Sequence, residues 1–327
     1  MKTIGIIGLG SIGRRHLRLV KEIRPNLNVV AIRSGLGGDV DEASLVTQTV
    51  ASIEEALELG IEAAIIATPA DLHESQVRAL SESSIPFLVE KPLTLDLDEA
   101  NHLLIHLDKS RGVGLVGYNL RYNSSLQHFR NLLSANTVGE TLHASIDCGS
   151  YLPDWRPGRD YRTTPSAQKK LGGGVLRELS HEIDYALWLF GPFQSIFATV
   201  KNSGTLDVDV EDIATLYLES AQGHSVTLHL DFCRRHPNRS CTVFGTHGQV
   251  SWSGISQTVE LIDPSNRLIR QTFPEERDEM YRRQINHFFE MVEEEQSPLV
   301  PVAEGVEVMR LIEAAKESSR TNCRIML

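Results

Sequence analysis

The first third of the chain alternates short apolar runs with segments whose apolar residues recur every three or four positions. Runs that are apolar on both faces are typical of strands in a parallel sheet, and the recurring spacing between them predicts helices. The expected strands are Thr3 to Gly8, Val29 to Ile32, Ala63 to Ala67, Phe87 to Val89 and Val113 to Val116. The expected helices are Ser11 to Ile23, Ile53 to Leu59, Leu72 to Ser81 and Leu97 to Leu107. Repeated strand–helix units predict an α/β fold with a doubly wound parallel sheet.

The pattern changes after about Arg121. Strand-like runs dominate there, and turns such as Gln222-Gly223 and His247-Gly248 favour antiparallel pairing. The expected strands are Thr141 to Cys148, Ile196 to Val200, Ile213 to Leu218, Ser225 to Phe232, Cys241 to Gly245 and Gln249 to Trp252, and the expected helices are Ser125 to Leu133, Val175 to Phe190, Glu279 to Glu294 and Ala303 to Ser319. The sequence therefore predicts a doubly wound α/β domain over 1–120 and an α+β domain over 121–327.

Composition narrows the class of protein. The 327 residues are 41% hydrophobic and 23% charged with a formal net charge of −11, which is typical of a folded enzyme without a basic surface for nucleic acid. No run approaches the length of a membrane-spanning helix, and the apolar stretch Ile4 to Leu9 is short enough to be a strand instead of a signal peptide. The four cysteines are widely spaced, which favours reduced thiols and a cytoplasmic location.

A glycine-rich turn links the first expected strand to the first helix. It reads Gly8-Leu9-Gly10-Ser11-Ile12-Gly13. In this context Gly8 permits the tight turn, Gly10 lets backbone amides approach a pyrophosphate, and Gly13 lets helix and strand pack closely. The turn and its Ser11 and Ile12 amides are expected to bind a dinucleotide, which makes 1–120 a dinucleotide-binding Rossmann domain. The alternative is a glycine-rich turn without a ligand.

The end of the second strand bears on the choice of dinucleotide. An acidic residue there would bind the ribose 2′-hydroxyl of NAD, but this sequence has Arg33 and Ser34. A guanidinium and a hydroxyl can bind a 2′-phosphate, so NADP is predicted, with NAD possible. The alternative is that Arg33 is a solvated residue stacking on adenine, which either dinucleotide allows.

Further polar residues follow the next two strands, at the sheet edge where such folds bind ligands. Thr68 and Pro69 are expected to flank the dinucleotide, with His73 beside it. The triplet Glu90-Lys91-Pro92 presents a lysine from a turn stiffened by proline, placed to reach a reacting oxygen. On its own such a triplet is more often a solvated loop.

The order of these motifs resembles that of the glucose-fructose oxidoreductase / inositol dehydrogenase / rhizopine-catabolism (Gfo/Idh/MocA) family. The resemblance extends over most of the chain through the residues Gly117 to Tyr122 and Gly172-Gly173-Gly174, which lead to His181 and Asp184. It implies a C-terminal domain with a large, open, mainly antiparallel sheet that often builds a homodimer or homotetramer. It also implies oxidation or reduction of hydroxyl groups on sugars and inositols, with Lys91 and His181 at the catalytic positions.

Hydride transfer from a carbinol carbon requires a base for the hydroxyl proton, and histidine suits this role near neutral pH. Either Glu178 or Asp184 could orient the His181 imidazole. Many family members carry an aspartate four residues before this histidine, where this chain has Arg177. The identity of the acidic partner therefore stays open.

Aromatic residues and arginines are concentrated between Tyr151 and Arg162. Rings can stack on sugar faces while guanidiniums bind carboxylate or phosphate, so a sugar acid, sugar phosphate or nucleotide sugar is expected as the substrate. The expected substrate contacts are Asn119, Arg121, Tyr122, Trp155, Arg156, Arg159, Tyr161 and Arg162. An ordered surface loop or a dimer contact explains the same segment nearly as well.

The function that accounts for these features best is an NAD(P)-dependent oxidoreductase acting on CH–OH groups of a sugar-like substrate. Two alternatives are a glycosidase of the same family that uses NAD transiently and a dinucleotide sensor without enzymatic activity. No metal site is expected, because His102 and His106 lack an acidic or cysteine partner in sequence.

Overall fold

A computed structural model describes residues 1–35, 41–110 and 112–327 of the chain. Its contacts divide into two compact units. The first comprises Met1–Asn119 and Arg277–Met309, and the second comprises Leu120–Glu276 and Arg310–Leu327. The division after Asn119 lies beside the boundary expected at residue 120. The return of residues 277–309 to the first unit was not expected from the sequence.

The first unit contains a six-stranded sheet, parallel throughout, in the order β3-β2-β1-β4-β5-β6. Its strands are β1 Thr3–Ile7, β2 Asn28–Ile32, β3 Gln48–Val50, β4 Ala63–Ile66, β5 Phe87–Val89 and β6 Gly114–Val116. This confirms the expected Rossmann sheet. The polar strand β3 was missed because only Val50 of its three residues is buried, so it carries no apolar run.

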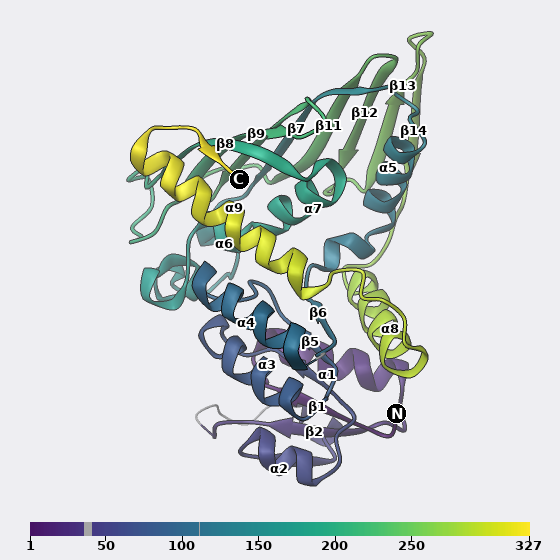
Figure 1. The fold of residues 1–327 in the computed structure, drawn as a ribbon, viewed down its shortest axis with the longest axis vertical. Coiled ribbons are helices and arrows are strands. Elements are labelled where there is room, and N and C mark those ends of the chain that lie inside the picture. The colour runs from purple at the N-terminus through teal and green to yellow at the C-terminus, as the bar shows by residue number, and fades with distance from the viewer. Residues whose placement is uncertain (36–40, 111) are drawn as a thin grey trace. The chain divides into compact units, whose positions relative to one another are not determined.

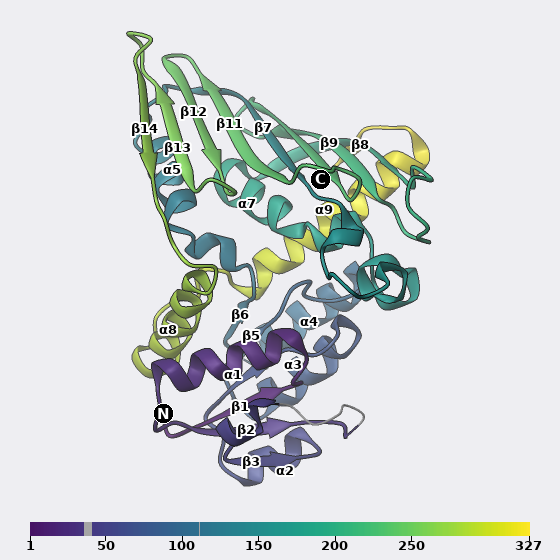
Figure 2. The ribbon, with the colours of Figure 1, turned by 180° about the vertical axis from the view of Figure 1, so that it is seen from behind.

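Helices cover both faces of this sheet (Figures 1 and 2). The helices α3 His73–Glu82 and α4 Leu97–Ser110 lie on one face, and α1 Ser11–Ile23 lies on the other. A shorter helix, α2 Ile53–Glu58, begins with Ser52, whose side chain accepts a hydrogen bond from the Glu55 amide. Because strands with helices on both faces bury every side chain, β4 is apolar at all four positions.

The helix α8 Glu279–Glu294 packs along α1 and so belongs to the first unit. Arg24 forms a bidentate ion pair with Glu293, at 3.1 and 2.8 Å, and its guanidinium lies over the ring of Phe289. Arg282 binds Glu22 at 2.8 Å. The sequence predicted this helix but not its partner, because the contacts join residues about 260 positions apart.

The second unit contains a nine-stranded sheet in the order β14-β13-β12-β11-β7-β10-β9-β8-β15. Only the β7–β10 pair is parallel, so the sheet is mainly antiparallel, as expected. The strands are β7 Thr141–Gly149, β8 Phe193–Lys201, β9 Ile213–Ser220, β10 Ser225–Asp231, β11 Asn238–Gly245, β12 Gly248–Ser253, β13 Thr258–Ile262, β14 Leu268–Thr272 and β15 Ile325–Met326. The last three were missed, because four of the five β14 residues are exposed and β15 is two residues long.

Helices lie on one face of this sheet and leave the other face bare (Figures 1 and 2). They are α5 Ser124–Ser134, α6 Val175–Glu178, α7 Ser180–Phe190 and the C-terminal part of α9 Val302–Thr321. The strands alternate accordingly: in β9 Ala214 and Leu216 are fully buried, whereas Tyr217 is exposed. The single helix expected over 175–190 is wrong, because the chain leaves helical geometry at Leu179 (φ −97°, ψ 28°).

All four cysteines are free thiols, two of them buried (Cys148 and Cys241). This agrees with the expectation of reduced cysteines, while the cytoplasmic location stays a prediction. No helix in the described ranges is long and apolar enough to cross a bilayer. Within the same ranges no group of three or more histidine, cysteine or acidic side chains is arranged to hold a metal ion.

Candidate active site

The glycine turn after β1 has the shape that its sequence predicts. Gly8 has φ +86°, a backbone conformation that side chains disfavour, and a Cβ there would lie 3.0 Å from the Ala67 carbonyl oxygen. A Cβ on Gly13 would overlap the carbonyl oxygen of Gly8. Among the residues that the structure describes, nothing lies within 4 Å of the position that a Cβ on Gly10 would occupy. The turn is therefore closed on its inner side and open at Gly10.

The N-terminus of α1 opens from this turn. Gly10 caps the helix without a side chain, and the first turn contains no acidic residue. The Ser11, Ile12 and Gly13 amides precede the first intrahelical donor, Arg14, which bonds to Gly10. Three amides that no carbonyl of the helix can accept, at the positive end of a helix dipole, suit a pyrophosphate, so these residues fit a dinucleotide.

Arg33 and Ser34 directly follow β2, which neighbours β1 in the sheet. The Arg33 amide donates to the Val50 carbonyl at 3.0 Å, which fixes its backbone beside β3. Its side chain is half-buried and that of Ser34 is exposed. Residues 36–40, which follow, lie outside the described part of the chain.

The turn after β4 contains Thr68 and Pro69. The Thr68 hydroxyl donates to Gln76 Oε1 at 2.7 Å, and its carbonyl lies 3.0 Å from His73 Nε2. His73 is 1% exposed. Its ring contacts backbone atoms of the protein, so it lies beneath the sheet edge and not at its surface.

Glu90 and Lys91 follow β5, two strands from β1 in the sheet. Glu90 is almost wholly buried and its Oε1 lies 2.7 Å from Nε2 of His16, a fully buried residue of α1. The other oxygen, Oε2, accepts the Lys91 amide at 3.3 Å. The glycine at 117 makes room for this carboxylate, because a Cβ there would lie 2.9 Å from Glu90 Oε2.

In the second unit, the three glycines before α6 form the turn that leads to His181. Gly172 and Gly174 have φ of +76° and +115°, and a Cβ on Gly174 would overlap the Glu211 carboxylate. The Gly174 amide donates to Ser166 and the Val175 amide to Glu211. These bonds anchor the start of α6. The break at Leu179 then places His181 in the first turn of α7, half-buried.

Two carboxylates close to His181 in the sequence bind arginine side chains. Asp184 accepts hydrogen bonds from Arg121 Nε at 3.0 Å and Nη2 at 2.7 Å. Glu182, which is fully buried, lies 2.8 Å from Arg239 Nε. Both ion pairs anchor the N-terminal half of α7. Asp184 connects it to Arg121 in the 119–122 segment, and Glu182 connects it to Arg239 in β11. Glu178, three residues before His181, is half-buried at the end of α6.

The expected substrate residues before α5 are buried. Asn119 and Tyr122 are each 4% exposed and Arg121 is 1% exposed. The Arg121 guanidinium also lies 5.4 Å from the centre of the Trp188 ring, and its carbonyl accepts a hydrogen bond from Gln127. These contacts anchor the segment to the core of the second unit.

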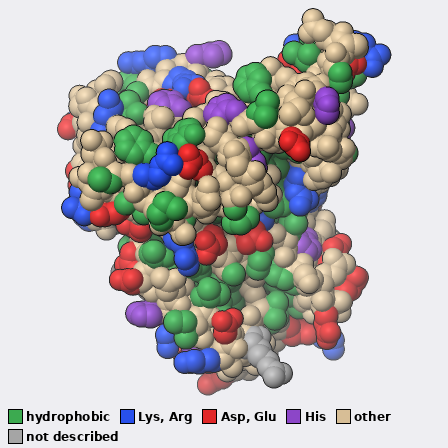
Figure 3. Space-filling view, turned by 45° about the horizontal axis from the view of Figure 1, so that its top comes forward, with side chains coloured by type: hydrophobic (Ala, Val, Ile, Leu, Met, Phe, Trp, Pro, Cys, Tyr) green, Lys and Arg blue, Asp and Glu red, His purple; other side chains and the backbone are tan. Residues whose placement is uncertain are grey.

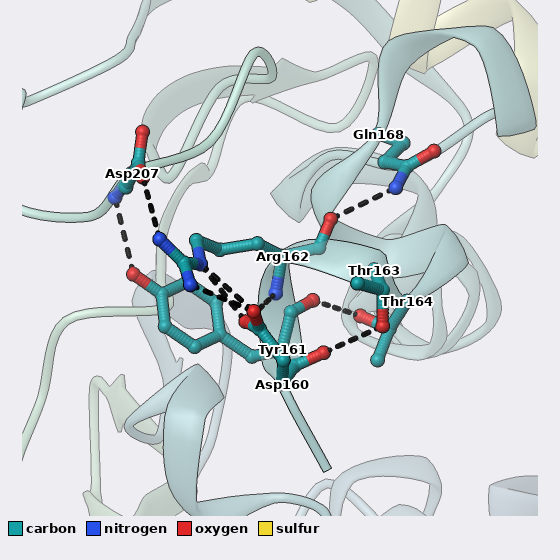
Figure 4. A network of polar contacts seen from close by, with 7 residues as sticks. All are labelled: Asp160, Tyr161, Arg162, Thr163, Thr164, Gln168 and Asp207. Carbon is teal, nitrogen blue, oxygen red and sulfur yellow. Dashed lines mark hydrogen bonds and ion pairs between the residues drawn. The ribbon is translucent and has the colours of Figure 1, made fainter.

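The loop between β7 and α6 is ordered by its own contacts. Trp155 packs edge-on against Phe232 and donates to the Ser150 hydroxyl at 2.7 Å. Arg162 pairs with Asp160 at 2.7 Å and with Asp207 at 3.2 Å, and the Tyr161 hydroxyl accepts the Asp207 amide (Figure 4). Arg156 and Arg159 are exposed, and in the described part of the chain neither forms an ion pair. These two arginines are therefore available to an anion.

Sequence reasoning missed three polar residues of these regions. They are His16 beneath Glu90, Glu182 beside His181, and Arg235, whose guanidinium lies 3.6 Å from the centre of the Tyr151 ring. His16 offered a signal, since it lies on the buried face of α1 with Leu17 and Val20, where a histidine needs a polar partner. Nothing in the sequence paired Glu182 with Arg239.

Comparison with family models places both units. Residues 2–118 match the model described as "Oxidoreductase family, NAD-binding Rossmann fold", and residues 126–251 match the "GFO/IDH/MocA C-terminal domain". The matches cover most of the chain. They confirm the resemblance that the motifs indicated and, at the level of the family, the expectation of an oxidoreductase acting on CH–OH groups.

Individual relatives have low sequence identity to this chain but align with most of its length. D-xylose 1-dehydrogenase (NADP(+)) 2 of Haloferax volcanii is 25% identical, with 82% of this chain and 81% of that protein aligned. Levoglucosan dehydrogenase, solved with NADH and levoglucosan, superposes with a TM-score of 0.88 at 18% identity over 100% and 99% of the two chains. The WlbA dehydrogenase from Bordetella pertussis, solved with NADH and UDP-GlcNAcA, gives 0.83 at 20% identity over 100% and 99%. At these identities the two structures show the shared fold.

Proposed function

This chain belongs to the Gfo/Idh/MocA family of oxidoreductases, and we propose that it transfers a hydride between a nicotinamide dinucleotide and a hydroxyl or keto carbon of an anionic sugar derivative. One observation carries the proposal. Lys91 follows β5 at the same edge of the parallel sheet at which the glycine turn follows β1 and Thr68 follows β4. Carboxyl ends of neighbouring parallel strands form the ligand edge of such folds.

The dinucleotide, when bound, supplies or accepts the hydride. The Ser11, Ile12 and Gly13 amides would hold its pyrophosphate. The Lys91 ammonium donates a hydrogen bond to the substrate oxygen, which stabilises the negative charge that develops as the hydroxyl proton leaves. His181 takes that proton during oxidation and returns it during reduction.

Glu178 is the proposed acidic partner of His181. It is half-buried and ends α6, three residues before His181, while Asp184 binds Arg121 and Glu182 binds Arg239. Asp184 then contributes to the reaction by holding α7, and not by touching His181.

NADP is the proposed dinucleotide. Arg33 and Ser34 follow β2 where a carboxylate would bind a ribose 2′-hydroxyl and repel a 2′-phosphate. A guanidinium at this position attracts the phosphate through charge-assisted hydrogen bonds. The Haloferax relative is named for NADP(+), whereas the two superposed structures contain NADH, so the family admits both dinucleotides.

The proposed substrate is a sugar acid, sugar phosphate or nucleotide sugar. Arg156 and Arg159 support this class, because both guanidiniums are exposed in the loop after β7. Trp155 and Tyr161 from the same loop offer ring faces for a sugar or base. The WlbA structure contains an anionic nucleotide sugar, UDP-GlcNAcA.

The bare face of the nine-stranded sheet is proposed to join copies of this chain into a dimer or tetramer. Phe197, Tyr217 and Phe244 are 39, 37 and 44% exposed on strands β8, β9 and β11. Figure 3 shows separate hydrophobic patches and histidines among polar surface in its upper part. Light scattering of the purified protein, compared with Tyr217→Glu, tests this: a monomer in both samples would refute it.

A substrate screen tests the proposed activity. Sugar acids, sugar phosphates, nucleotide sugars and neutral polyols are each incubated with NADP⁺ and NAD⁺ while the absorbance of reduced nicotinamide is followed. For the best substrate, Lys91→Ala and His181→Ala are expected to lower kcat by about 10²- to 10⁴-fold, the usual range for loss of a general acid or base. Lys109→Ala and His102→Ala, on the exposed side of α4, are the matched controls.

Three outcomes would overturn the proposal. Normal turnover in both site variants would show that Lys91 and His181 do not carry the chemistry. Release of a free sugar without net reduction of the dinucleotide would point to the glycosidase alternative. Binding of NADPH without turnover of any compound would favour a sensor.

A further inference from the structure

The His73 ring is enclosed by backbone carbonyl oxygens on two sides. It is the first residue of α3 and is 1% exposed. Nδ1 lies 3.0 Å from the Pro92 oxygen and 3.2 Å from the Leu93 oxygen, and Nε2 lies 3.0 Å from the Thr68 oxygen. The two nitrogens of this buried ring thus face carbonyl oxygens from two separate turns of the first unit.

Each of these turns bears on the proposed site. Thr68 follows β4 at the ligand edge of the sheet, and Pro92 and Leu93 are the two residues after Lys91. Leu93 is fully buried, so its carbonyl group is part of a fixed layer of the structure. A side chain that binds these carbonyls restrains the backbone from which Lys91 projects.

The residue before Lys91 is held separately. Glu90 lies 2.7 Å from the buried His16, and its second oxygen accepts the Lys91 amide at 3.3 Å. The His16 contact ties this carboxylate to α1. The N-terminal side of the lysine is thus restrained by Glu90, and the restraint on its C-terminal side comes from His73.

The three carbonyls outnumber the donors that a neutral imidazole has. Burial lowers the pKa of His73, while hydrogen bonds to Thr68, Pro92 and Leu93 and the nearby Glu90 carboxylate act in the opposite direction. A neutral ring donates from one nitrogen. Since Nδ1 faces two oxygens and Nε2 faces one, the tautomer with the proton on Nδ1 makes more contacts.

We propose that His73 is a positioning residue for Lys91, which acts by donating from Nδ1 to the carbonyls of Pro92 and Leu93. This inference rests on the proposed role of Lys91 and extends it. The ring does not touch the reacting atoms. It fixes the direction in which the ammonium group points, and a displacement of about 1 Å at such a group can cost about 10²-fold in rate.

Two amide variants separate the contacts of the ring. The side-chain nitrogen of Asn occupies about the position of Nδ1, and that of Gln occupies about the position of Nε2. His73→Asn can therefore still donate toward Pro92 and Leu93, whereas His73→Gln can donate only toward Thr68. His73→Leu keeps most of the buried volume and removes both donors. Unfolding temperature is measured for each variant, so that loss of fold is recognised.

Kinetics with the best substrate from the screen provide the first measurement. His73→Gln and His73→Leu are expected to lower kcat by about 10- to 100-fold, and His73→Asn by no more than about 3-fold. The KM for NADP should change little in all three, because the glycine-turn amides do not depend on His73. Equal loss in the Asn and Gln variants, or loss in neither, would overturn the inference.

A second measurement needs no substrate. Lysines are reductively dimethylated with ¹³C-formaldehyde, and the Lys91 signal is identified by its absence from Lys91→Arg. We expect its chemical shift to move in His73→Gln and to stay near the parent value in His73→Asn. An unmoved Lys91 signal in all variants would refute the positioning role.

Failure of this inference is distinguishable from failure of the proposed function. If Lys91→Ala turns over normally, the function assigned to Lys91 is wrong whatever the His73 variants do. If Lys91→Ala is inactive and both His73→Gln and His73→Leu remain fully active, the function stands and the role of His73 is wrong.

Discussion

Arg121 and Asp184 form a bidentate ion pair in which the two side chains are 1% and 0% exposed. Asp184 lies three residues after His181 in α7, and Arg121 lies in the turn before α5. The pair therefore fixes α7 to a segment 63 residues earlier in the chain. Both residues were candidates for the chemistry or the substrate, yet each binds the other inside the second unit.

Loss of the Asp184 carboxylate should destabilise the second unit. Asp184→Ala leaves a buried guanidinium without its carboxylate, and breaking such a pair typically costs about 3–5 kcal/mol of unfolding free energy. The midpoint of urea denaturation measures the change. Asp160→Ala, which removes an exposed partner of Arg162, is the control and should leave the midpoint unchanged. Equal midpoints for the two variants would contradict a structural role for Asp184.

Arg33 should govern the choice between dinucleotides. Arg33→Ala is expected to raise the KM for NADP by about 10- to 100-fold, the loss of a hydrogen bond to a charged group, and to leave the KM for NAD within about 2-fold. Initial rates with each dinucleotide at saturating substrate measure both constants. An equal rise in the KM for NADP and the KM for NAD would mean that Arg33 contacts a group that both dinucleotides contain, such as the adenine.

Arg156 and Arg159 should contribute to the binding of an anionic substrate more than Arg162 does. Each Ala variant of the first two is expected to raise the KM for an anionic sugar by about 10-fold with kcat nearly unchanged. Arg162→Ala is the matched control, because that guanidinium already pairs with Asp160 and Asp207. A neutral polyol should show no change in any variant. A larger effect of Arg162 would reverse this assignment.

Acid should weaken the protein partly through His73. Burial lowers the pKa of the folded ring below the ordinary value of 6.5. Below pH 6.5 the unfolded state binds the proton more readily, so stability present above that pH is lost as pH falls toward the folded value. His73→Gln should flatten the decline of unfolding temperature between pH 6.5 and pH 5, and His102→Gln should not. Parallel curves for parent and His73→Gln would contradict the shift.

The cysteines should differ sharply in reactivity. Burial raises the pKa of Cys148 to about 12 and also raises that of Cys241, so both remain thiols at pH 8, whereas Cys323 is exposed. Titration of the native protein with a disulfide reagent should show a fast phase that Cys323→Ser removes. Rapid reaction of Cys148 or Cys241 in the folded protein would show that the helices covering them open readily.

The first unit could be predicted in detail because its signals are local. Gly8, Gly10 and Gly13 lie within six residues, and each glycine has a reason that belongs to the turn itself. Strands buried on both faces are continuous apolar runs, so β1, β2 and β4 could be recognised without knowledge of their neighbours. Lys91 could be placed at the ligand edge from its position after such a run.

The second unit was harder to predict from the sequence because one face of its sheet is exposed. Strands β13 and β14 bury only Val259 between them, and β14 exposes four of its five residues, so neither forms a long apolar run. The helix expected over 175–190 was interrupted at Leu179 because the turn containing Gly174 and the ion pair of Glu182 with Arg239 fix the two halves separately. These contacts join residues that are far apart in the sequence, so the spacing of apolar residues along the chain does not reveal them.

By itself the sequence determined the parallel fold of the first unit, the glycine turn that fits a pyrophosphate, and the family. Only the tertiary structure decided that Asp184 binds Arg121, that His16 lies beneath Glu90 and that His73 faces three carbonyls. The physical reason is the range of each interaction. A turn or an apolar strand is encoded by adjacent residues, whereas a buried charge or imidazole takes whichever partner the folded chain brings within about 3 Å.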